Sequence, residues 1–296
     1  LELPMWEISP QLVSEKSIDS DYIFIPHKMK QNWYLDKRIL YYMQMVIPNL
    51  FSIDRNGWCA TSSNWPIKAN GNPNSPEVLD LIKRANNNES KFPQPKTILE
   101  KDTNLPKRFL LFVCQIPHDE TIRFHSDIGV EMALNVALQW TNLTNSGVEL
   151  VIKGHPINPA SMQGLKNMVS EFKSKISSTK ADCIHWIDNK SIHTLIKNSL
   201  GVLTVNSGAG LEAIIHTKRV FTFGNADYAS AAEKIVYGGS IQNAINSLNI
   251  ALNKTYDKNE HILQCYKFLD SWCSSNFDSG NYNSFSKLSG LNILRK

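Results

Sequence analysis

The sequence predicts an α/β protein built on a parallel sheet. From residue 107 onward, continuous apolar runs of strand length alternate with amphipathic helical stretches, a pattern typical of parallel strands that are covered on both faces. Residues 201–224 show the unit most clearly: an apolar run, a turn of small residues, a short helix and a second apolar run. At 296 residues the chain is long enough for two such domains of ordinary size.

The first 106 residues predict a smaller α/β region. Strands are expected at 22–25 and 51–54, and helices at 37–50 and 76–85. The apolar residues of the first helix recur with helical spacing: Ile39, Leu40, Met43, Val46 and Ile47. Residues 86–106 are polar and contain three prolines, which predicts a linker.

The remaining chain supplies the elements of the parallel sheet. Its strands are expected at 109–114, 148–152, 183–187, 202–205 and 220–223. Its helices are expected at 127–141, 161–175, 192–198 and 211–216. Residues 229–252 predict helix in pieces, and a last amphipathic helix is expected at 261–272 before a polar tail.

Composition and charge exclude several classes of protein. A net charge of +4 is too small to indicate nucleic-acid binding, but it suits a phosphorylated ligand or attraction to an anionic membrane surface. No apolar run approaches the ~20 residues of a membrane span, and no secretory signal is visible. We therefore expect a cytoplasmic protein with peripheral contact at an anionic membrane surface. The chain begins at Leu1 and not at methionine, so we expect it to be a piece of a longer protein.

Neither a metal nor a disulfide framework is indicated. The 5 cysteines are scattered, odd in number and free of CxxC spacing. His118 and His125 match no established ligand set. We therefore expect no metal site and a reducing compartment.

Polar residues, together with glycines and one proline of the adjoining turns, follow the expected strands at the points where the strands end. They are Gln115, Asp119 and Glu120 after the first strand of the sheet, Lys153, Gly154, His155 and Pro156 after the second, Asn206, Ser207, Gly208, Gly210 and Glu212 after the fourth, and Tyr228 after the fifth. Ligands of open parallel sheets bind outside the carboxyl ends of the strands, so these residues are expected to face one crevice.

Each of these residues has a functional and a structural interpretation. His155 could bind or protonate a leaving phosphate, or be an ordinary turn histidine. Asp119 could be a base or a nucleophile, but aspartate after a strand is often an N-cap. Ser207 and the free N–H groups of its turn favour an anion, or the serine is only a cap. Glu212 could reach ribose hydroxyls, or be a surface glutamate.

The motifs together resemble a known family. The segment KGHP (153–156), followed by VNSGAGLEAIIHTKRVFTFG (205–224), resembles bacterial capsule-type glycosyltransferases that add β-linked Kdo (3-deoxy-D-manno-oct-2-ulosonic acid). FVCQIPHDET (112–121) resembles their Gln-Val-x-x-Asp-x-Ser element, with Gln115, Asp119 and Thr121 at the matching positions. SIDRNGW (52–58) faintly resembles their acceptor-side turn. After TFG the family pattern is kept only at Tyr228, so the chain is a divergent member or belongs to a sister branch.

This resemblance implies a GT-B fold, with two Rossmann-like domains and the active site in the cleft between them. Residues 1–106 would be the acceptor domain and 107–255 the donor domain, with the helix of 256–296 packing back on the amino-terminal domain. The family is retaining, which implies that Asp119 attacks the anomeric carbon. His155, Lys153 and Ser207 would hold the phosphate of CMP, and Glu212 the ribose.

The implied activity is transfer of Kdo from CMP-β-Kdo to a glycan or lipid-linked glycan in capsule or lipopolysaccharide synthesis, without cofactor or metal. The HP and serine elements also occur in bacterial sialyltransferases, so they specify the nucleotide better than the sugar. Another CMP- or CDP-dependent GT-B enzyme, such as a sialyltransferase or a polyol-phosphate transferase, is therefore the first alternative. A non-catalytic glycan-binding module is the second, and the joint presence of Asp119, His155 and Ser207 argues against it.

Overall fold

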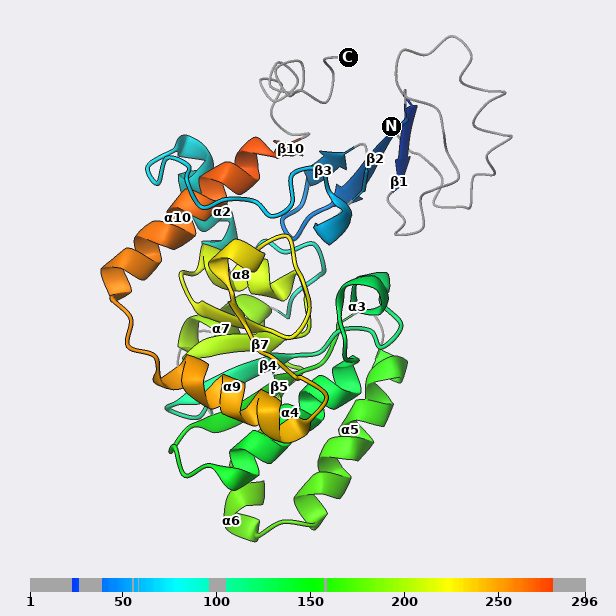
Figure 1. Cartoon of the computed structure of the whole chain (residues 1–296), viewed down its shortest axis with the longest axis vertical. Coiled ribbons are helices and arrows are strands. Elements are labelled where there is room, and N and C mark those ends of the chain that lie inside the picture. The colour runs from blue at the N-terminus through cyan, green and yellow to red at the C-terminus, as the bar shows by residue number, and fades with distance from the viewer. Residues whose placement is uncertain are drawn as a thin grey trace, which may run out of the picture.

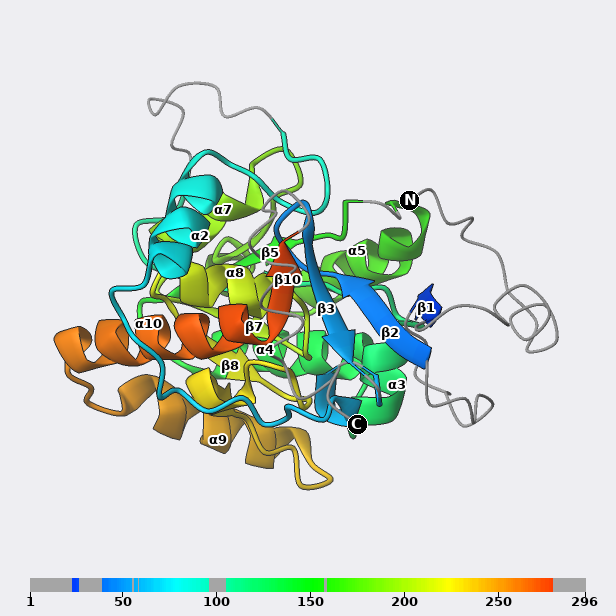
Figure 2. The same cartoon turned by 90° about the horizontal axis from the view of Figure 1, so that it is seen from above.

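The structure is a computed structural model that describes residues 23–26, 39–54, 56–57, 59–95, 105–156 and 159–278. Within these ranges, a six-stranded sheet lies between layers of helices, and a four-stranded sheet lies beyond one of these layers (Figures 1 and 2). The α/β class with a parallel sheet is confirmed. One pocket is lined by residues from both the amino-terminal and the carboxyl-terminal parts of the described chain, as expected for a GT-B fold.

The six-stranded sheet has the strand order of a dinucleotide-binding Rossmann domain. Its strands are β4 (Phe109–Val113), β5 (Glu149–Lys153), β6 (Ile184–Trp186), β7 (Gly201–Thr204), β8 (Arg219–Thr222) and β9 (Glu233–Lys234). They are arranged β6-β5-β4-β7-β8-β9, and every neighbouring pair is parallel. The order reverses between β4 and β7, so a crevice opens between the carboxyl ends of these two strands.

Strand β4 shows why the sheet is covered on both faces. All five of its residues are buried. Leu110 and Phe112 pack into one hydrophobic cluster, whereas Phe109, Leu111 and Val113 pack into a second cluster on the opposite face. The continuous apolar run that predicted this strand is therefore required by burial on both sides.

Helices complete each cluster. The first cluster includes residues of α4 (Val130–Leu143), α5 (Pro159–Ser174) and α9 (Ile241–Asn253). The second includes residues of α2 (Pro76–Asn86), α7 (Ile192–Asn198), α8 (Ala209–Ile215) and α10 (Lys258–Ser274). Two further helices are short: α3 (Glu120–His125) and α6 (Ser178–Ala181). Single 3-10 turns form at Cys59–Thr61 and Ala229–Ala231.

The smaller sheet joins the two ends of the chain. Its strands are β1 (Ile23–Pro26), β2 (Ile39–Gln44), β3 (Leu50–Asp54) and β10 (Asn276–Asp278), in that spatial order. Strand β1 is parallel to β2, and the other pairs are antiparallel. Helix α10 packs against α2 and α8, and β10, which follows α10, pairs with β3.

The helix predicted at 37–50 is wrong. Residues 39–44 form strand β2, and a turn leads directly into β3, closed by a 2.8 Å bond from the Met45 amide to the Leu50 carbonyl. The apolar residues fit helical spacing, but this short run contains Ile39, Tyr41 and Tyr42, and these residue types favour strands. Helix α3 and strand β10 were not predicted, because each has too few residues to show a period.

Candidate active site

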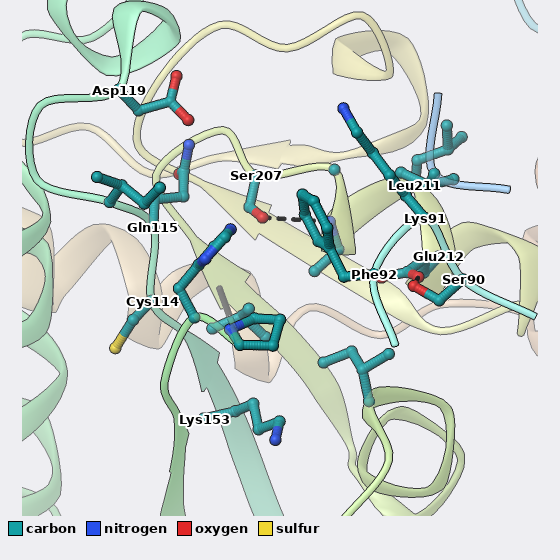
Figure 3. Close-up of a pocket in the computed structure, with 18 of the residues that line it drawn as sticks. Ser90, Lys91, Phe92, Cys114, Gln115, Asp119, Lys153, Ser207, Leu211 and Glu212 are labelled. Carbon is teal, nitrogen blue, oxygen red and sulfur yellow. Dashed lines mark hydrogen bonds between the residues drawn. The ribbon is translucent and has the colours of Figure 1, made fainter. Parts of the chain in front are cut away.

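The main pocket lies at the carboxyl ends of β4, β5 and β7, where the strand order reverses. It has a volume of about 260 Å³. Figure 3 shows side chains from both halves of the chain facing this space. Most of the site residues predicted from the sequence line it: Gln115, Asp119, Lys153, Gly154, His155, Pro156, Asn206, Ser207, Gly208 and Glu212.

Asp119 lies at the pocket wall as the N-cap of helix α3. Its Oδ1 accepts hydrogen bonds from the Thr121 amide at 2.9 Å and from the Thr121 hydroxyl at 2.7 Å. Asp119 is therefore an N-cap, and both of its capping bonds are accepted by the same oxygen, Oδ1. The carboxylate is fixed by that oxygen while its side chain faces the pocket (Figure 3).

A buried network ties the first turn of α3 to the point where the strand order reverses. Gln115 Oε1 accepts from the Asn206 amide at 2.9 Å, and Gln115 Nε2 donates to Asn206 Oδ1 at 3.0 Å and to the Thr121 hydroxyl at 3.3 Å. Asn206 Nδ2 in turn donates to the Thr121 carbonyl at 2.8 Å. Gln115 and Asn206 are both buried, so the network excludes water and holds Thr121 beneath Asp119.

The cationic residues after β5 differ in their environment. Lys153 is buried, and its Nζ donates to the Asp188 carbonyl at 2.6 Å. His155 packs edge-on against Phe92, with 5.2 Å between ring centroids. Burial lowers the pKa of His155, an effect that the Asp119 carboxylate opposes and Lys91 strengthens. His155 is therefore a neutral imidazole at pH 7, able to donate one N–H.

Packing explains three of the glycines. A Cβ on Gly154 would lie 2.9 Å from Asp188 Oδ1, and a Cβ on Gly208 would lie 2.7 Å from Val46 Cγ1. A Cβ on Gly210 would lie 2.3 Å from the Tyr228 hydroxyl oxygen. The absence of side chains at these glycines allows other groups to pack closely, and those groups are side chains of the protein and not a ligand. The Ser207 hydroxyl accepts from the Ala209 amide at 3.2 Å at the pocket surface, whereas the N-cap residue of α8 is Gly208.

Three predicted site residues do not line the pocket. Tyr228 is fully buried, and its hydroxyl donates to the Ser207 carbonyl. Gly210 packs against the ring of Tyr228, so both residues support the turn from behind. Glu120 is exposed at the start of α3. The assignment of Tyr228 and Glu120 to the cleft wall is therefore corrected, because Tyr228 packs behind the turn and Glu120 begins the helix that Asp119 caps.

Glu212 is buried at the pocket wall rather than exposed on the surface. Its Oε1 accepts from the Ser90 hydroxyl at 2.7 Å. Burial raises the pKa of Glu212 to about 7, and the bond from Ser90 opposes this rise. Glu212 therefore takes up a proton at a higher pH than an exposed glutamate does.

Sequence reasoning missed one wall of the pocket. Gln44, Met45 and Val46 line it from the end of β2, and Ser90, Lys91, Phe92 and Gln94 line it from the segment predicted to be a linker. A strand at 39–44 would have placed Gln44, Met45 and Val46 at a strand end, where ligands of such sheets bind. No signal in the sequence places residues 90–94 at the pocket, because their contacts are with residues far away in the chain.

Arg55 and Trp58, both in the 52–58 turn, lie outside the described residues. In the part of the chain that the structure describes, no group of three or more His, Cys, Asp or Glu side chains is arranged to hold a metal. No helix among the same residues is long and apolar enough to cross a membrane.

Comparison with known proteins identifies relatives in capsule synthesis. A family model described as capsule polysaccharide biosynthesis protein matches residues 72–232. The capsule polysaccharide export protein KpsS of Escherichia coli is 27% identical over 140 residues, which are 47% of this chain and 35% of KpsS. The chain therefore spans about a third of the length of this curated relative.

Solved structures with a related fold include two of KpsC from Thermosulfurimonas dismutans. The beta Kdo 2,7 transferase is 17% identical, with a TM-score of 0.48 over 81% of this chain and 80% of that one. The beta Kdo 2,4 transferase is 16% identical, with a TM-score of 0.45 over 78% of this chain and 71% of that one. The UDP-GlcNAc 2-epimerase of Methanocaldococcus jannaschii is 18% identical, with a TM-score of 0.36 over 52% and 41%.

Proposed function

Since the chain belongs to the capsule polysaccharide biosynthesis protein family, we propose that it is a glycosyltransferase that moves Kdo from CMP-β-Kdo to a glycan or lipid-linked glycan with retention. The observation that carries the proposal is the convergence of three separate segments on one pocket. Asp119, His155 and Ser207 follow three different strands, yet all three line the same cavity. A carboxylate, an imidazole and a hydroxyl at one site are the groups that a two-step transfer from a phosphorylated donor requires.

In the first step, Asp119 acts as the nucleophile. Its carboxylate attacks the anomeric carbon, and the bond from that carbon to the phosphate oxygen breaks, with the electron pair leaving on CMP. Thr121 holds Oδ1 through two bonds, so the other oxygen is available for attack. The neutral His155 donates a hydrogen bond to the departing phosphate, and Lys153 adds positive charge beneath it.

In the second step, the acceptor hydroxyl replaces Asp119. Its oxygen attacks the anomeric carbon from the face that CMP has left, its proton passes to His155, and Asp119 departs as a carboxylate. Two inversions give net retention. We propose that Glu212 accepts hydrogen bonds from the ribose during both steps. We further propose that the transfer uses no metal, because Lys153 supplies positive charge and His155 a hydrogen bond to the phosphate.

The proposal is tested by incubating the protein with CMP-Kdo and synthetic glycan acceptors. Mass spectrometry should detect a product heavier by one Kdo residue, and NMR should show a β-linkage. CMP-sialic acid and a CDP-polyol are assayed in parallel. Preferential transfer from either of these would replace Kdo as the donor. Glycan binding with no transfer from any donor would favour a binding module.

A further inference from the structure

Residues 90–94 form a wall of the pocket that is held in place by both halves of the chain. The Ser90 hydroxyl donates to Glu212, the Lys91 amide donates to the Val46 carbonyl at 2.6 Å, and Gln94 Oε1 accepts from the Ile192 amide at 2.9 Å. Backbone and side-chain bonds thus fix this segment at its start, middle and end. Its side chains are therefore positioned with respect to the pocket and do not behave as an unattached linker.

Lys91 extends from this wall toward the space that Asp119 faces. Figure 3 shows its amine reaching from the Phe92 side of the pocket, with the Asp119 carboxylate on the opposite side. Its Nζ donates to the Gln44 carbonyl at 3.0 Å and lies 5.5 Å from the centroid of the Phe92 ring. An ammonium group has three N–H donors, so the bond to Gln44 leaves others for a ligand. Burial lowers the pKa of Lys91, and the negative charge of Asp119 opposes this effect.

The other basic groups at the pocket are less suited to a charge on the sugar. Lys153 is buried and bonded to the Asp188 carbonyl. Burial lowers the pKa of His155, so the imidazole is neutral at pH 7. Among the pocket residues that the structure describes, Lys91 thus combines a positive charge, partial exposure and a position facing Asp119.

We propose that Lys91 forms the subsite for a carboxylate attached to the anomeric carbon of the donor sugar, and so selects donors of the 2-ulosonic acid class. This inference rests on the proposed function. In such a sugar the anomeric carbon bears both the phosphate and a carboxylate, and the negative charge of that carboxylate opposes the approach of Asp119. A cation at this position offsets the repulsion and orients the sugar for attack. Phe92 supplies an apolar face beside the ammonium and packs against His155.

The test compares Lys91→Met, which keeps the length of the side chain without its charge, with Lys91→Arg. Lys83→Met, on the exposed face of α2, is the matched control for loss of one surface charge. We expect Lys91→Met to lower kcat/KM for CMP-Kdo by at least 30-fold, about the effect of one charged hydrogen bond. The inhibition constant of CMP should change by less than threefold. Lys91→Arg should recover part of the loss, and Lys83→Met should match the wild type.

Two results would overturn the inference while leaving the proposed function intact. One is a Lys91→Met enzyme as active as the wild type. The other is an inhibition constant for CMP that rises as much as kcat/KM falls, because Lys91 would then contact the nucleotide and not the sugar. A wild-type protein that transfers no Kdo and binds no CMP would instead refute the proposed function, and this inference with it.

Discussion

Replacing Glu212 by glutamine should change how the stability of the protein depends on pH. Glu212 is only 5% exposed, and burial raises its pKa from the ordinary value of 4.5 to about 7. The folded state therefore binds this proton more tightly than the unfolded state does. The contribution of protonated Glu212 to stability is fully present below pH 4.5 and is lost as the pH rises through about 7. Each unit of difference between the folded and unfolded pKa of Glu212 is worth about 1.4 kcal/mol, so the loss of stability amounts to about 3 kcal/mol.

Urea unfolding of the wild type and of Glu212→Gln, measured between pH 4.5 and 8, tests this reasoning. Glutamine is neutral throughout, so the free energy of unfolding of the variant relative to the wild type should rise by about 3 kcal/mol across the range. His193 Nε2 lies 3.9 Å from Glu212 Oε1, and burial lowers the pKa of His193, so the titration of His193 contributes to the difference at the acid end of the range. Glu120→Gln is the control for the loss of one carboxylate at an exposed position. A difference for Glu212→Gln that is the same at pH 5 and pH 8 would refute the buried, proton-binding role.

Three further predictions concern the pocket. Thr121→Val should lower kcat about 10- to 100-fold without changing the inhibition constant of CMP, because the hydroxyl bond of Thr121 orients Asp119. Thr121→Ser keeps the hydroxyl and should remain active. Equal activity of both variants would contradict this role. His155→Ala should lose about 100-fold or more in turnover while keeping its melting temperature, and near wild-type turnover would return His155 to a structural role. CMP at 100 times its Kd should stabilise the folded protein by about 2.7 kcal/mol and so raise its melting temperature, whereas UDP and GDP should not raise it. A larger rise in melting temperature with UDP would exclude a CMP donor.

The strand ends around the pocket were predictable because the central strands of the large sheet, β4, β5, β7 and β8, are almost entirely buried. Continuous apolar runs marked the strands, and parallel alignment then brought the residues after them to one edge, as Asp119, His155 and Ser207 show. The burial of Tyr228 and of Glu212 was not predictable, since it depends on the packing of α8 against distant segments.

The amino-terminal half was harder to predict for physical reasons. Strand β2 is six residues long, and its apolar positions fit a helix as well as a strand. Residues 90–94 are polar and follow a helix, which is the ordinary pattern of a linker. Their place in the pocket depends on bonds to Glu212, Val46 and Ile192, and local sequence carries no record of such contacts.

The central claim is that Asp119 forms a covalent bond to the sugar, and intact-protein mass spectrometry tests it most directly. The protein is mixed with CMP-Kdo and a poor acceptor, quenched, and digested to locate any adduct. We predict an added mass of one Kdo residue on Asp119 in the wild type and in Glu120→Gln, and no adduct in Asp119→Asn, which should still bind CMP. An adduct that maps to another residue, or an Asp119→Ala variant that transfers Kdo at the wild-type rate, would contradict the account.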